Sequence, residues 1–235
     1  MYFFTIFAIP FAYLLELFYK LFGNYAISII VLSVLVRGAV YPIYKKQIIA
    51  SVNMGKIQPK IKAIQRKYAN DKAMLNQKMA ELYKEEKFNP MAGCLPGLIQ
   101  MIVIMGLFTL LRNPIHFIQN DSMYFAIHES FLWIPDLSQP DLWILPILAG
   151  IATFLSTFLS SVQMEGQPGG NAMQVMMKYV FPIIIIWLAR SYPAALAIYW
   201  FVSQTMQIFF NLHLNKIKKE LKEGDKKKKS KKVNA

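Results

Sequence analysis

Residues 33–42 read SVLVRGAVYP and place one arginine, Arg37, inside an apolar run that is long enough to cross a membrane. A helix needs roughly 20 apolar residues to span a hydrocarbon core about 30 Å thick. At about 1.5 Å per residue, Arg37 lies roughly 10 Å inside the boundary marked by Lys45 and Lys46. A guanidinium at that depth either snorkels to the headgroups or faces a polar cavity, and physics alone leaves both readings open.

Composition indicates a membrane protein of several spans. Hydrophobic residues make up 55% of the 235-residue chain, and the formal net charge is +13. The charges gather in two segments, whereas long stretches carry almost none, which is not the distribution of a solvated surface. The single cysteine, Cys94, excludes an intramolecular disulfide and is best read as a small apolar residue.

Five segments have the length and apolarity of membrane-spanning helices. They cover residues 24–45, 90–111, 142–162, 173–189 and 194–214. Pro193 favours a tight turn between the last two, which therefore form a hairpin. We predict an all-α polytopic membrane protein in which the block 89–215 holds transmembrane helices two to five.

Orientation follows from the positions of the cations. Segments 46–88 and 216–235 are rich in lysine, whereas the loop 113–141 contains four carboxylates and no Lys or Arg. Because loops retained in the cytoplasm carry excess Lys and Arg, both basic segments are predicted to be cytoplasmic. The N-terminus is then outside, the C-terminus is inside, and the loop 113–141 is outside.

Three further segments are predicted from local patterns. Residues 1–23 form an amphipathic helix in the outer interface, started by Pro10, with an additional span as the alternative. Residues 46–88 form a cytoplasmic two-helix hairpin, because apolar residues recur at helical spacing on both sides of Asn70-Asp71; a solvated connector is the alternative. Residues 216–235 form a disordered basic tail that binds anionic lipids or ribosomal RNA, or serves only as a topology signal.

The predicted spans contain no Asp or Glu that could neutralise Arg37. They offer neutral polar side chains instead, which describe a hydrated cavity rather than a buried ion pair: Gln100, Ser156, Thr157, Ser160, Ser161, Gln163, Tyr199, Ser203, Gln204, Thr205 and Gln207.

Three motifs carry a resemblance over nearly the whole chain. Arg37 is followed by YPIYKKQ at residues 41–47 and by FNPMAGCLPGLIQM at residues 88–101, and LAIYWFVSQ occupies residues 196–204. The second motif contains Asn89, Pro90, Gly93, Cys94, Pro96, Ile99 and Gln100. Together they resemble the YidC/Oxa/Alb family of membrane-protein insertases, in its bacterial five-span form.

The resemblance implies a five-helix bundle around a hydrophilic groove that is closed to the outside and open to the cytoplasm and to lipid. It implies insertion of nascent membrane proteins in a bacterial cell membrane, with no ATP hydrolysis, cofactor or metal. Ribosomes, the Sec translocon, the signal-recognition particle pathway and anionic lipids are the implied partners. The implied substrate-binding groove comprises Arg37, Gln100, Tyr199, Trp200, Ser203 and Gln204. Helix packing is the competing explanation for Gln100, Tyr199 and Trp200.

Two other functional classes compete with insertion. A small secondary transporter could bind an anionic solute at Arg37, but such transporters show internal repeats and paired broken helices, and neither is found here. An intramembrane protease would need a Ser-His pair within the spans, whereas His116 and His128 fall in the outer loop and His213 at the end of the last span.

Overall fold

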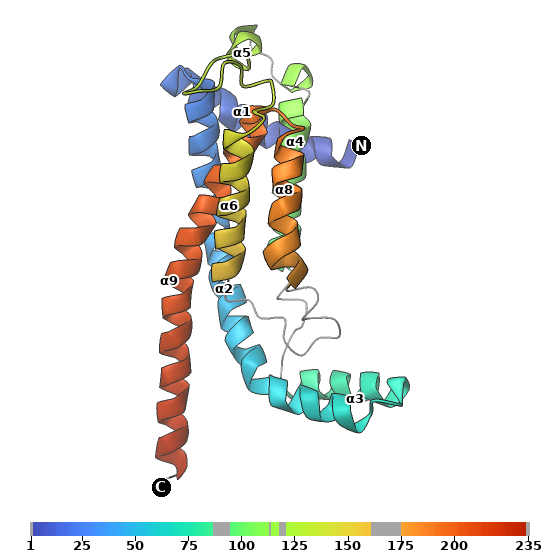
Figure 1. Ribbon diagram of the computed structural model, residues 1–235. Helices are drawn as coiled ribbons and strands as arrows, with labels where there is room; N and C mark the ends of the chain where they lie inside the picture. The colour runs from blue at the N-terminus through green and yellow to red at the C-terminus, as the bar shows by residue number, and fades with distance from the viewer. Residues whose placement is uncertain (1, 87–94, 113, 118–120, 161–174, 234–235) are drawn as a thin grey trace.

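The computed structural model describes residues 2–86, 95–112, 114–117, 121–160 and 175–233 (Figure 1). Within these ranges the regular elements are helical, and the one β-type pairing is a bridge between Phe131 and Ile134. The helices are α1 (Tyr2–Phe22), α2 (Tyr25–Lys67), α3 (Lys72–Glu85), α4 (Leu95–Arg112), η2 (Pro114–His116), α5 (Asp121–Ala126), α6 (Ile144–Leu159), the π-helical turn η3 (Met176–Val180), α8 (Phe181–Ala189) and α9 (Ala194–Val233).

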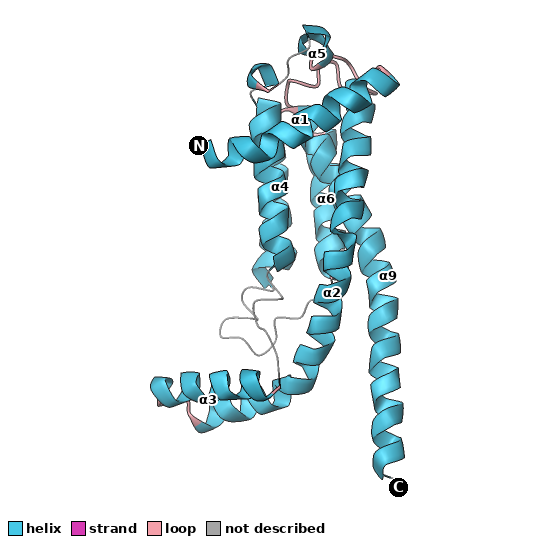
Figure 2. Cartoon of the chain, turned by 180° about the vertical axis from the view of Figure 1, so that it is seen from behind, coloured by secondary structure: helices cyan, strands magenta, loops and turns pink. Residues whose placement is uncertain are grey.

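The long helices form an elongated bundle in which α9 packs between α2 and α6, and α8 packs on α6. Helix α4 packs mainly on α1 and touches α2 and α9 only sparsely. Helix α1 runs across one end of the bundle, while α3 and the last turns of α9 lie at the other end (Figure 2). The arrangement separates α1 at one end of the bundle from the hairpin of α2 and α3 at the other, and the orientation of these ends in a membrane stays a prediction.

Helix α1 differs in detail from the predicted amphipathic helix. Ala8, Ala12 and Leu15 are fully buried against the bundle, but the opposite side also exposes apolar residues such as Tyr13 and Leu17. Its exposed side is therefore largely apolar, with Glu16 and Lys20 as the charged residues of the helix. Pro10 lies inside the helix instead of starting it. The interfacial location of α1 remains a prediction.

Helix α2 is continuous from Tyr25 to Lys67, so the first span and the first helix of the expected hairpin are one element. The Asn24 side chain caps its start by accepting a hydrogen bond from the Ile27 N–H at 3.0 Å. No helix break occurs at residues 45–46 or at Gly55. The helix bends toward α3 in its distal half (Figure 1), and Pro42 and Pro59 each remove one of its backbone hydrogen bonds.

A hairpin joins the end of α2 to α3 around a small apolar core of its own. Ile57 and Ile61 are buried against Leu82, with Ile64, Met79 and Tyr83 packed around them. Asp71 caps α3 by accepting from the Met74 N–H at 3.0 Å. The apolar stripes read from the sequence therefore pack on each other, while residues 87–88 lie outside the described residues.

The lengths of the helices bear on the predicted spans. In the described residues, one helix is long and apolar enough to cross a membrane, Tyr25–Lys46, and three apolar helices are shorter: Leu98–Arg112, Ile144–Leu159 and Met176–Ala189. The count of five spans therefore stays a prediction. The basic tail was expected to be disordered, but α9 continues as a helix to Val233; lysine and glutamate are good helix formers, which explains the difference.

The loop between α5 and α6 is folded against the starts of three helices. The Glu129 carboxylate accepts from the Tyr25 N–H of α2 at 2.8 Å and from the Tyr19 hydroxyl at 2.7 Å. Asp141 accepts from the Leu145 N–H of α6 at 3.0 Å. The carbonyls of residues 137 and 139 accept from the first N–H groups of α9. Carboxylates are stabilising at helix N-termini, so the acidic loop organises this end of the bundle.

Candidate functional site

Arg37 faces the interior of the bundle. It is 3% exposed, and its Nη1 donates to the Tyr44 hydroxyl at 3.0 Å and to Gln207 Oε1 on α9 at 3.1 Å. No carboxylate of the described residues forms an ion pair with it. A side chain that snorkelled outward would not be enclosed in this way, so the geometry favours a polar interior site.

A chain of hydrogen bonds extends from Arg37 across α9 to α6. Gln207 Nε2 donates to Asn211 Oδ1 at 2.9 Å, and Asn211 Nδ2 donates to the Ser156 carbonyl at 2.7 Å. The Ser156 hydroxyl in turn donates to Gln204 Oε1 at 2.6 Å. Every member apart from Arg37 is neutral. The network therefore solvates a buried cation with dipoles instead of a counter-ion.

The Ser156 carbonyl is available to Asn211 because α6 ends there. The Ser160 N–H bonds to Thr157 instead of Ser156, and the Leu159 carbonyl accepts from Asn215 Nδ2 at 2.9 Å. Two asparagines of α9 thus satisfy carbonyls that the last turn of α6 leaves unpaired. Side chains of one helix cap the other and fix their relative register.

Trp200 joins the same pair of helices one turn further along. Its indole Nε1–H donates to Thr153 Oγ1 at 2.9 Å, and its ring lies 6.2 Å from the ring of Phe181 on α8. The polar edge of Trp200 is therefore used between α6 and α9. This contact supports the packing interpretation of Trp200 without removing the functional one, because the side chain is only partly buried.

Tyr199 and Ser203 lie one helical turn apart on α9, and each is 1% exposed. The Tyr199 hydroxyl interacts with Arg37, Ser203 and Gln100, the last from α4. None of these reaches hydrogen-bonding geometry, so the Tyr199 hydroxyl, Ser203 Oγ and Arg37 Nε are all buried without a partner. Buried polar atoms without partners are costly, and they indicate where a bound molecule would be stabilised.

The structure thus brings Arg37, Gln100, Tyr199 and Ser203 together and turns Trp200 and Gln204 toward α6. Thr157 and Thr205 donate to carbonyls of their own helices, and their place in the predicted cavity stays a prediction. Ser161, Gln163, Asn89, Pro90, Gly93 and Cys94 lie outside the described residues.

Sequence reasoning missed three members of the network: Tyr44, Thr153 and Asn211. One signal was available for Asn211. Polar residues recur every fourth position along α9, at Tyr199, Ser203, Gln207 and Asn211, and that spacing places them on one face of a helix.

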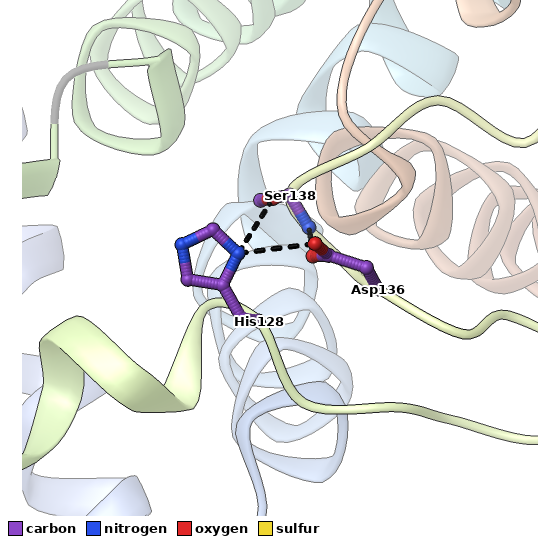
Figure 3. A network of polar contacts seen from close by, with 3 residues as sticks. All are labelled: His128, Asp136 and Ser138. Carbon is purple, nitrogen blue, oxygen red and sulfur yellow. Dashed lines mark hydrogen bonds and ion pairs between the residues drawn. The ribbon is translucent and has the colours of Figure 1, made fainter.

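A Ser-His pair does occur in the loop between α5 and α6 (Figure 3). Ser138 Oγ and Asp136 Oδ2 both lie 3.0 Å from His128 Nδ1. A hydrolytic triad needs the acid on one ring nitrogen and the nucleophile on the other, so this cluster has the wrong geometry for catalysis. Partial burial pushes the pKa of Asp136 upward, but the hydrogen bonds from His128 and Ser138 outweigh it and hold that pKa below its ordinary value.

The described residues contain no group of three His, Cys, Asp or Glu side chains that could hold a metal ion. The site is built from one cation, hydroxyls and amides. Its residues define a helical membrane protein with a polar interior site, a class that the apolar composition also indicates.

Comparison with known proteins identifies the family. A family model described as 60Kd inner membrane protein matches residues 17–223. The chain is 37% identical over 212 residues to "Membrane protein insertase YidC 2" of Listeria innocua, covering 88% of this chain and 69% of that protein. It is 39% identical over 198 residues to "Membrane protein insertase YidC" of Fusobacterium nucleatum, covering 84% and 89%. The chain belongs to the YidC/Oxa/Alb family, as the sequence motifs indicate.

A solved structure agrees with this assignment. The fold matches "Active YidC insertase crystal structure with the first transmembrane domain resolved" with a TM-score of 0.57 at 26% identity. The match covers 86% of this chain but only 44% of that chain.

Proposed function

We propose that this chain inserts nascent membrane proteins through a hydrophilic groove that is lined by Arg37 of α2 and by the polar face of α9. Family membership and the names of its relatives support insertion. One observation carries the assignment of the groove: Arg37 is buried among neutral partners, beside polar atoms that have none. A buried cation without a counter-ion is suited to attracting a negatively charged ligand.

The mechanism follows from desolvation. A client segment must carry its polar extracellular tail across the hydrocarbon core, and each unsatisfied polar group costs several kcal/mol there. Polar side chains partway into the bilayer shorten the distance over which that cost applies. The Arg37 guanidinium attracts Asp or Glu in the tail, and an ion pair is stronger in this enclosed site than in water.

The apolar part of the client leaves toward lipid. Apolar side chains are exposed on α2 at Val34 and Leu35, on α6 at Ile151 and Phe158, and on α9 at Phe209. In our proposal a nascent span slides along these side chains and partitions into the bilayer. Hydrophobic transfer supplies the driving force, so no nucleotide is required.

Topology and partners complete the proposal. The outer cap closes the groove on the side of Glu129, and the hairpin of α2 and α3 lies in the cytoplasm of a bacterial cell. The lysine-rich end of α9 contacts ribosomal RNA or anionic headgroups, and the Sec translocon and the signal-recognition particle pathway supply further clients. Five spans with the N-terminus outside satisfy the charge pattern.

Reconstitution tests the proposed function directly. The purified protein is placed in liposomes without nucleotide, and a single-span client is scored by protease protection of its translocated tail. We expect protection well above that of protein-free liposomes. Protection equal to that of protein-free liposomes would contradict the proposal.

Cysteine labelling tests the shape of the groove. In a Cys94→Ala background, Gln100→Cys and Gln204→Cys should react with a membrane-impermeant maleimide added from the cytoplasmic side only. Equal labelling from both sides would indicate a channel or a transporter instead.

A further inference from the structure

Three buried atoms of the site share one chemical property. Arg37 Nε, the Tyr199 hydroxyl and Ser203 Oγ have no hydrogen-bond partner among the described residues, and their side chains are 3%, 1% and 1% exposed. Arg37 Nε can only donate, and the two hydroxyls can also donate. A ligand that satisfies all three together must therefore be an acceptor.

Helix geometry brings the three groups to one place. Tyr199, Ser203 and Gln207 follow one another at intervals of four residues and so share a face of α9. Arg37 is fixed against that face by its hydrogen bond to Gln207. Arg37 and Ser203 are both near enough to the Tyr199 hydroxyl to influence it, so the three groups are neighbours between α2 and α9.

Charge decides which kind of acceptor fits. The Arg37 cation is buried, and its two Nη1 hydrogen bonds go to the neutral oxygens of Tyr44 and Gln207. Water would satisfy the donors but would leave the charge uncompensated, whereas an anion does both. We propose that Arg37, Tyr199 and Ser203 bind one small monovalent anion, chloride in the resting protein.

The anion site adds a step to the proposed insertion mechanism, and this step rests on that proposed function. A client carboxylate presents the same acceptor chemistry and charge as the resident anion, so the two exchange at Arg37. The resident anion keeps the guanidinium compensated between clients, and its release offsets part of the cost of desolvating the incoming acidic side chain.

Chloride binding can be measured without any client. The probe is the ³⁵Cl NMR linewidth of sodium chloride in the presence of the protein in nanodiscs, titrated with bromide. The wild type should show a saturable excess linewidth that bromide removes. The Tyr199→Phe/Ser203→Ala double variant should bind chloride about a hundredfold more weakly, because each hydrogen bond to an ion contributes about a factor of ten.

Both substitutions leave the net charge of +13 unchanged, so nonspecific attraction of chloride to the basic chain is the same in all samples. Thr205→Ala is the matched control, since its hydroxyl donates to the Phe201 carbonyl at 2.9 Å within α9, and it should bind like the wild type. If the double variant does not fold, Ser203→Ala alone should bind about tenfold more weakly.

The proposal is overturned if the wild type has no saturable component, or if the folded double variant retains it unchanged. Sodium acetate serves as the carboxylate probe and should displace chloride from the wild type. Failure of acetate to compete would contradict the exchange step. Because no client is present, these outcomes are independent of the liposome insertion assay.

Discussion

Replacing Asn211 with alanine tests the polar network where it links Arg37 to α6. Asn211 is 5% exposed, accepts from Gln207 Nε2 at 2.9 Å and donates to the Ser156 carbonyl at 2.7 Å. Each hydrogen bond in a membrane bundle contributes about 0.6 kcal/mol on average, and each partner left buried and unpaired costs about 1–3 kcal/mol. We therefore expect Asn211→Ala to lower the free energy of unfolding by about 1–3 kcal/mol.

Asn215→Ala is the matched control for this substitution. Asn215 also donates to a carbonyl at the end of α6, that of Leu159, but it lies two helical turns from Gln207, whereas Asn211 lies one turn away and bonds to it. Unfolding free energies in detergent and insertion of a client with an acidic tail are measured for both variants. Asn211→Ala should lose more insertion than Asn215→Ala at equal stability, because Gln207 no longer holds Arg37 firmly. Equal insertion by the two variants would refute the network as a support for Arg37.

Three other predictions concern packing and the outer cap. Gly150→Ala should weaken the packing of α6 on α8 by about 1–3 kcal/mol, since its Cβ would clash with the Ile186 side chain. In an Ile186→Ala background the same substitution should cost much less, which a calorimetric double-mutant cycle measures. Glu129→Ala should cost about 1–3 kcal/mol and speed amide exchange in α1. The pKa values of Asp136 and Asp141 lie below the ordinary 3.8. Both carboxylates should therefore stabilise the folded protein fully above pH 5, and this contribution should disappear as the pH falls below about 4. The melting temperature should fall over that range in the wild type and fall less in the Asp136→Asn and Asp141→Asn variants.

The lowered pKa of Asp141 has the same origin as its role as a cap. Partial burial pushes that pKa upward, but hydrogen bonds from the Trp133 indole and from the backbone N–H groups of residues 143 and 145 outweigh it. Protonation removes a charged acceptor from the start of α6. The folding stability should therefore decrease on acidification, as is usual for a carboxylate whose pKa is lowered in the folded protein.

Part of the site could be read from the sequence. The depth of Arg37 follows from its distance to Lys45, and the predicted spans hold no carboxylate but do hold neutral polar residues such as Tyr199 and Ser203. Their assignment to one groove with Arg37 came from the family resemblance. The pairing of Asn211 with the end of α6 could not be predicted. Near the cytoplasmic end of a span, an asparagine is expected to meet water, and only the tertiary arrangement shows that a helix terminus lies beside it.

The continuity of α2 was hidden for a different reason. The sequence predicts residues 46–88 as a hairpin separate from the first span, and Gly55 and Pro59 are both unfavourable inside a helix. The structure keeps the helix because Ile57 and Ile61 bury their side chains against Leu82 of α3, and that tertiary packing outweighs the local propensity. Whether tertiary packing outweighs local helix propensity cannot be judged from the sequence of α2 alone, because the packing partner is on α3.

Insertion of clients that differ only in tail charge is the most direct test of the central claim, that the Arg37 charge draws acidic tails into the groove. Wild type, Arg37→Lys and Arg37→Ala are compared in proteoliposomes at matched protein levels. A unit pair about 4 Å apart contributes about 4 kcal/mol at an effective dielectric of about 20, whereas a neutral tail gains nothing comparable. A third of that energy changes partitioning about tenfold.

Arg37→Lys keeps the charge and should retain much of the activity with every client, although it loses the planar fork that holds Tyr44 and Gln207. Arg37→Ala should lose tenfold or more of the insertion of clients with Asp or Glu in the tail and should largely spare those with neutral tails. An equal loss across the whole series in Arg37→Ala would contradict the account and would leave Arg37 as a structural anchor of α2.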